Sequence, residues 1–134
     1  MIQKQISAYL ENKPGQLLDY VQVLGENNID LQALSIADTE DYGLLRMIVD
    51  QPEKAVELLK KAGHSCRITE VLSVVIPDRP GAMRKALAAL NDARISFDYC
   101  YAFFSKEEGK ANLVLRVPDN DEALKALEAA GALE

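Results

Sequence analysis

The chain has 134 residues, of which 49% are hydrophobic and 27% are charged, a balance that predicts a globular fold and excludes a mostly disordered chain. Its formal net charge of −6 opposes the basic footprint that nucleic acids and anionic membranes select, so we expect neither as a partner. No apolar run approaches the roughly 20 residues that span a bilayer, and the first residues lack the apolar core of a signal peptide. The sequence therefore predicts a cytoplasmic protein.

The chain contains an internal repeat. Pro-Gly occurs in ENKPGQLL at residues 11–18 and again in PDRPGAMR at residues 77–84, an offset of 66 positions. The same offset places Gly43 on Gly109 and Met47 on Leu113, and the register slips by two residues before the last helix of each half. A period of this length indicates two copies of one structural unit.

The first half is predicted to form a strand, a helix, two strands and a second helix. Alternating apolar residues indicate the strands, and apolar residues recurring every three or four positions indicate the helices. In chain order the residues are Ile6, Ala8 and Leu10; Leu17, Val21 and Leu24; residues 29–37; Leu45, Met47 and Val49; and Ala55, Leu58, Leu59 and Ala62. A fourth strand is expected within residues 65–70, running almost without a linker into the second half.

The second half repeats this order. Its periods are carried by Leu72, Val74 and Ile76; Met83, Leu87 and Leu90; residues 95–104; Ala111, Leu113 and Leu115; and Ala123, Ala126, Leu127 and Ala130. Only three residues follow Gly131, so the last strand of this half is expected to be short or missing. Because an unpaired sheet edge is commonly covered by another chain, we expect a homodimer.

These orders predict an α+β protein of two tandem ferredoxin-like βαββαβ modules, residues 1–70 and 71–134, each with an antiparallel sheet and two helices. Modules of about 65 residues are marginal alone, so a buried interface between them, with sheets side by side, is expected. Asn12 and Asp78 are predicted to cap the helices that follow the two Pro-Gly sequences, and residues 119–122 to cap the last helix.

The sequence offers little catalytic equipment. It has one histidine, no phosphate-binding glycine-rich loop and no cluster of metal-ligating residues, which favours a protein that is not an enzyme and uses no metal or cofactor. Cys66 and Cys100 lie far apart without CxxC spacing and are expected to be buried thiols in strands.

The pattern resembles the ACT-domain family, small βαββαβ modules that sense amino acids in metabolic regulation. The resemblance covers nearly the whole chain as a tandem pair, and its motif is a strand, a polar residue, a variable residue and Pro-Gly opening a helix. Asn12-Lys13-Pro14-Gly15 and Asp78-Arg79-Pro80-Gly81 both match this motif. The family usually has Asp where Asn12 stands, so the first copy departs slightly. We call residues 11–18 the first corner and residues 77–84 the second corner.

The corners suit a small zwitterion, because glycine permits close backbone approach and free N–H groups at a helix N-terminus attract a carboxylate. The resemblance implies an amino-acid site between the Pro-Gly loop of one module and the second strand of the other. The ligand-binding residues this implies are Asn12, Lys13, Pro14, Gly15, Gln16 and Leu17; Asp78, Arg79, Pro80, Gly81, Ala82 and Met83; and Leu31, Phe97, Asp98 and Tyr99.

The two sites are not expected to be equal. Asn12 is neutral where Asp78 is anionic, and the second half carries an alternating aromatic run, Phe97, Tyr99, Tyr101 and Phe103, which fits one face of a core or interface. The sequence therefore favours the first corner, facing this aromatic strand, as the better pocket. The predicted function is an amino-acid sensor; the alternative is a regulatory subunit or interaction module that docks on an amino-acid biosynthetic enzyme without its own ligand.

Overall fold

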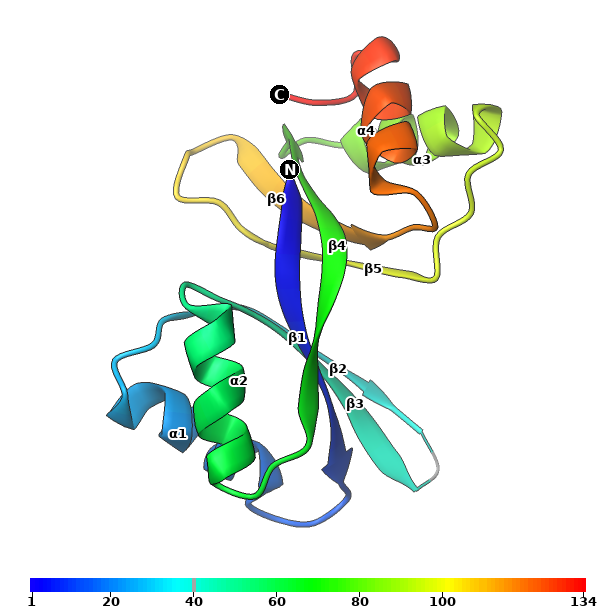
Figure 1. Cartoon of the computed structure of the whole chain (residues 1–134). Helices are drawn as coiled ribbons and strands as arrows, with labels where there is room; N and C mark the ends of the chain where they lie inside the picture. The colour runs from blue at the N-terminus through cyan, green and yellow to red at the C-terminus, as the bar shows by residue number, and fades with distance from the viewer. Residues whose placement is uncertain (40) are drawn as a thin grey trace. The chain divides into compact units, whose positions relative to one another are not determined.

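The computed structural model describes residues 1–39 and 41–134 (Figure 1). In chain order its elements are β1 (Ile2–Glu11), α1 (Gln16–Glu26), β2 (Leu31–Asp38), β3 (Tyr42–Val49), α2 (Pro52–Lys61), β4 (Cys66–Pro77), α3 (Ala82–Asp92), β5 (Tyr99–Phe104), β6 (Lys110–Arg116) and α4 (Asn120–Ala129). None of the helices in these residues is long and apolar enough to cross a membrane. The chain divides into two compact units, which we call the N-terminal unit, Lys4–Thr69, and the C-terminal unit, Glu70–Glu134 together with Met1–Gln3.

The N-terminal unit is an antiparallel sheet with the strand order β2-β3-β1-β4, packed against α1 and α2. Met47 of β3 stands opposite Ile6 of β1 and Leu34 of β2. The core between sheet and helices contains Ile6, Leu45 and Met47 from the strands, with Tyr20 and Leu59 from the helices. Alternation along each strand therefore sends every second side chain to the helix-covered face, as the sequence predicts.

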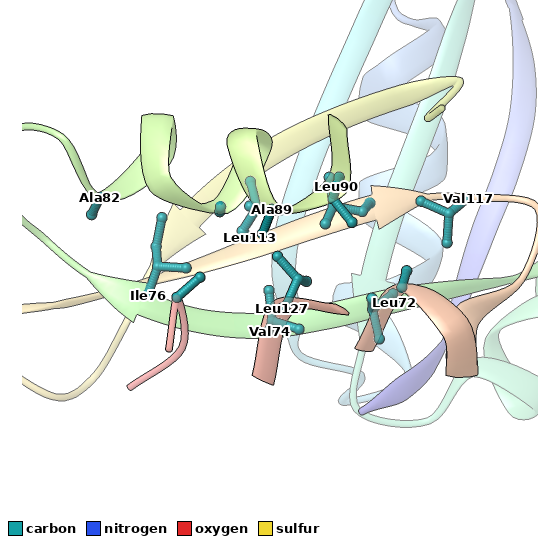
Figure 2. Packing of buried hydrophobic residues seen from close by; sticks show 13 residues of the cluster. Leu72, Val74, Ile76, Ala82, Ala89, Leu90, Leu113, Val117 and Leu127 are labelled. Atoms are coloured by element: carbon teal, nitrogen blue, oxygen red, sulfur yellow. The ribbon is translucent and has the colours of Figure 1, made fainter. Parts of the chain in front are cut away.

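The C-terminal unit repeats this arrangement with the order β4-β6-β5, and α3 and α4 cover one face of the sheet. Figure 2 shows Leu72 and Val74 of β4, Leu113 of β6, Leu90 of α3 and Leu127 of α4 converging on one core. On α3 the buried stripe is Ala82, Ala86, Ala89 and Leu90. Of the predicted stripe, Leu90 is buried and Met83 is half-buried against this core, whereas Leu87 is half-buried and is not part of the core cluster.

The free edge of β4 in the C-terminal unit is paired by residues from both ends of the chain. The N–H of Ser73 donates to the carbonyl of Met1 at 2.8 Å, and the amino group of Met1 donates to the carbonyl of Ser73 at 2.9 Å. Further along β4, the N–H of Glu134 donates to the carbonyl of Val75 at 2.9 Å. Among the described residues no strand follows α4, and these contacts lie where the fourth strand of the repeat would stand.

The second strand of each half begins later than predicted. Asn28 and Arg94 have φ angles of 55° and 58°, and the next residues, Ile29 and Ile95, donate their N–H groups back to helix carbonyls at 2.9 Å. A left-handed residue followed by such a backward hydrogen bond is a common helix C-terminal cap. Residues 29–30 and 95–98 therefore lie outside β2 and β5.

The predicted caps Asn12 and Asp78 are wrong. Gly15 and Gly81 occupy the N-cap positions of α1 and α3, and neither helix has a side-chain cap. The last helix is capped as predicted, because the Asp119 carboxylate accepts a hydrogen bond from the N–H of Glu122 at 3.1 Å.

This difference predicts unequal effects of two aspartate substitutions. We expect Asp119→Ala to lower the free energy of unfolding by about 1 kcal/mol, the usual value of a lost N-cap. Asp78→Ala, the matched control, is expected to change it by less than about 0.5 kcal/mol, as for other surface positions. Urea denaturation of both variants measures the difference, and equal losses would contradict the cap assignment.

Candidate functional site

The two corners have the same backbone geometry. Gly15 has φ 87° and ψ −7°, and Gly81 has φ 89° and ψ −14°. In each, the glycine carbonyl accepts a 3.0 Å hydrogen bond from the N–H four residues on, Asp19 in one corner and Lys85 in the other. A positive φ strains any residue with a Cβ, so both positions require glycine. A Cβ built at either glycine meets no atom within 4 Å, so the space above each corner is open.

At the first corner the loop residues Asn12, Lys13, Pro14 and Gly15 are exposed. Gln16 and Leu17 open α1 and are half-buried, and Leu17 packs against the core of its own unit.

The charges of this loop are paired within it. The Lys13 ammonium lies 2.6 Å from the carboxylate of Glu11. Their hydrogen bond lowers the pKa of Glu11 and raises the pKa of Lys13, so both groups are held in their charged forms. The cation of the first corner thus already has an anion beside it.

At the second corner Asp78, Arg79, Pro80 and Gly81 are exposed, whereas Ala82 is buried and Met83 packs against the core. The N–H of Asp78 donates to the carbonyl of Gly109 at 2.8 Å, which ties the loop to the turn between β5 and β6.

A pocket of about 220 Å³ opens beside this corner. It is lined by Pro77, Arg79, Pro80, Gly81, Ala82, Lys85, Gly131 and Ala132. Pockets for drug-sized ligands measure roughly 300–1,000 Å³, so this one suits a smaller molecule. The walls come from the second corner, from the first turn of α3 and from the residues that follow α4.

The structure thus brings Arg79, Pro80, Gly81 and Ala82, four of the predicted site residues, around one pocket. The other four lining residues were not among the predicted site residues: Pro77, Lys85, Gly131 and Ala132. Lys85 was recognisable in principle, because it lies four residues after Gly81 and so one helical turn above it. No sequence pattern indicated that Gly131 and Ala132, which follow α4, would lie beside the second corner, because their position depends on how α4 packs.

The predicted second-strand residues are not among those that line this pocket. Leu31 begins β2 and packs on the core of its own unit. Phe97, which is 39% exposed, and Asp98 precede β5, and the N–H of Asp98 donates to the carbonyl of Arg116 at 2.8 Å. Tyr99 is the first residue of β5. The predicted pairing of a corner in one unit with the second strand of the other stays a prediction.

Both thiols lie in strands as predicted, but only Cys66 is buried as predicted. Cys66 is buried at the start of β4 and Cys100 is half-buried in β5, and both are free. Burial raises the pKa of both thiols, which keeps them protonated and unreactive near neutral pH. Within residues 1–39 and 41–134, no group of three His, Cys, Asp or Glu side chains could hold a metal ion.

Comparison with known proteins identifies a family and several similar folds. The family model described as an ACT domain pair matches residues 1–130. A solved protein from Bacteroides thetaiotaomicron is 37% identical with a TM-score of 0.89, over 98% of this chain and 90% of that one. The ligand-free regulatory subunit of aspartate kinase from Thermus thermophilus is 16% identical with a TM-score of 0.68, over 97% and 95% of the two chains. Its Thermus flavus counterpart is also 16% identical, with a TM-score of 0.66 over 98% and 95%. No curated protein sequence matches the chain.

Proposed function

Because this chain belongs to the ACT-domain-pair family, whose modules are typical regulatory domains, we propose that it binds a free amino acid and acts as a regulatory protein rather than an enzyme. The observation that carries the proposal is the second corner. There a glycine N-cap, the first turn of α3 and an open pocket of about 220 Å³ meet. The ligand's carboxylate would lie against this helix N-terminus, where unpaired N–H groups and the helix dipole favour an anion.

The first corner supports a second site of the same kind. Its glycine has the same left-handed conformation, with open space above it. The sequence favours the first corner as the better pocket, because the aromatic strand of the second half is expected to face it. The pocket described above, however, lies at the second corner. Replacing Gly15 and Gly81 separately by leucine, followed by calorimetric titration, distinguishes the corners, because the more important one loses more affinity.

A sensor must convert binding into an output. A ligand that binds only the folded or assembled chain stabilises that state by an amount set by its concentration relative to its dissociation constant. We propose that occupancy changes the assembly of this protein, either as a homodimer or on a cytoplasmic metabolic enzyme. A ligand can shift such an equilibrium only through unequal affinity for the two states.

A thermal-shift screen of the twenty amino acids against the full chain tests the proposed function. We expect one amino acid, or a chemically related group, to raise the melting temperature. At one hundred times the dissociation constant the stabilisation is about 2.7 kcal/mol, which corresponds to several degrees for a protein of this size. Absence of any shift, confirmed by calorimetry at millimolar amino acid, would exclude a free amino acid as the ligand.

The alternative is an interaction module that docks on an amino-acid biosynthetic enzyme without its own ligand. Exposed apolar side chains favour it: Leu18 is 65% exposed on α1, and Leu34 and Ile36 of the edge strand β2 are 41% and 46% exposed. Large apolar side chains in water often mark docking surfaces when they are contiguous. A chain that shows no thermal shift but co-purifies with such an enzyme, and loses it on Leu34→Ser and Ile36→Ser, would support this alternative.

A further inference from the structure

The repeat provides an internal comparison between two corners of nearly identical backbone. At the offset of 66 positions, Arg79 corresponds to Lys13, Lys85 to Asp19, and Pro77 to Glu11. At these three positions the first copy therefore has two acidic residues and one basic residue, and the second copy has two basic residues and a proline, while Asp78 stands where the first copy has the neutral Asn12. Backbone geometry is shared, so the difference between the corners is mainly one of charge.

In the second corner the cations have no internal partners. Lys13 is neutralised by Glu11 at 2.6 Å, but the position equivalent to Glu11 is Pro77, which has no charge. Within the described residues neither Arg79 nor Lys85 forms an ion pair. The loop also carries the Asp78 carboxylate, but this residue is not among those that line the pocket.

The residues that line the pocket likewise include cations but no anion. Arg79 and Lys85 are its only charged residues, and the others are glycine, alanine and proline. The far wall, formed by Gly131 and Ala132, brings no carboxylate side chain into the pocket, and a Cβ at Gly131 would lie 3.7 Å from the Lys85 ammonium. Arg79 and Lys85 are both exposed. Two cations without ion pairs, in a small concavity whose other residues carry no charge, favour a ligand with two anionic groups.

From this charge pattern we infer that the second-corner pocket takes an amino acid with an acidic side chain, in preference to its neutral amide. The inference rests on the proposed function, because it names the class of amino acid that the same site binds. One carboxylate of the ligand pairs with Arg79, whose planar guanidinium suits bidentate recognition, and the other pairs with Lys85. The first corner, with Asp19 and a paired Lys13, disfavours the same ligand.

Isothermal titration calorimetry of the full chain tests the inference with aspartate and glutamate against asparagine and glutamine. We expect the acids to bind at least about tenfold more tightly, since one charge-assisted hydrogen bond contributes about 1.5–3 kcal/mol, and about 1.4 kcal/mol is tenfold. Arg79→Gln and Lys85→Gln are each expected to weaken acid binding by roughly tenfold and amide binding by less. Arg84→Gln removes the same charge from α3 outside the pocket and should change affinity less than about twofold.

The outcomes separate the inference from the proposed function. Equal affinity for acid and amide, or equal losses from Arg79→Gln and Arg84→Gln, would overturn the inference while an amino-acid site remains. Binding of no amino acid at all would overturn the proposed function as well. Succinate binding as tightly as aspartate would overturn the inference, because succinate has the two carboxylates but lacks the ammonium group of an amino acid.

Discussion

Truncating Leu113 to alanine is expected to lower the free energy of unfolding by about 2–5 kcal/mol, the range for a leucine removed from a packed core. Leu113 is 1% exposed in the middle of β6, between Val74 of β4 and Ala102 of β5. The helix-covered side of this position is filled by α3 and α4, so the vacated volume cannot collapse without moving a helix (Figure 2). Chemical denaturation monitored by circular dichroism measures the loss.

The matched control is Leu18→Ala, which removes the same atoms from a side chain that is 65% exposed on α1. We expect this substitution to change the free energy of unfolding by less than about 0.5 kcal/mol, because most of the Leu18 side chain is already in contact with water in the folded protein. Comparable losses in the two variants would contradict the assignment of Leu113 to the core of the C-terminal unit.

Removing Met1–Gln3, with the initiator methionine placed before Lys4, is expected to destabilise the C-terminal unit although residues 70–134 are unchanged. The deletion leaves the backbone of Ser73 without its two hydrogen bonds to Met1. At about 0.5–1.5 kcal/mol for each bond, the loss is about 1–3 kcal/mol. Amide hydrogen exchange should show faster exchange at Ser73, while the N–H of His64, bonded to Leu59 in the N-terminal unit, keeps its protection.

Ile2→Ala serves as the control for this deletion. Ile2 is 45% exposed, and the substitution keeps the backbone that β1 presents to β4. Protection at Ser73 should therefore survive in this variant. Unchanged exchange at Ser73 after the deletion would show that Met1–Gln3 do not hold the edge of β4.

For the candidate site, the sequence located the loops but not the pocket. Pro-Gly at a strand-to-helix boundary can be recognised from the sequence alone. The positive φ of Gly15 and Gly81 depends on the residue type at a single position, not on contacts with distant residues. The sequence also misassigned the caps, since Asn12 and Asp78 occupy positions where cap-forming residue types are common. The cap positions are occupied by Gly15 and Gly81. The sequence alone does not distinguish a glycine at a helix N-cap from a glycine in a turn.

The sequence by itself determined the ACT-like repeat and the order and type of most elements in each half. The exception is the fourth strand of the first half and the first strand of the second half, which form one continuous strand, β4. A strand buries every second side chain and a helix buries one in every three or four. These periods in the apolar residues can therefore be recognised directly in the sequence. The tertiary structure alone decided how the edge of β4 is paired and how Arg79 and Lys85 share a pocket with Gly131. The edge contacts of Met1 and Glu134 are made by backbone N–H and carbonyl groups and by the terminal amino group, not by side chains, and so they leave no pattern in residue type. The pocket forms where the end of α4 meets the start of α3, and the packing of two helices on one sheet fixes that approach.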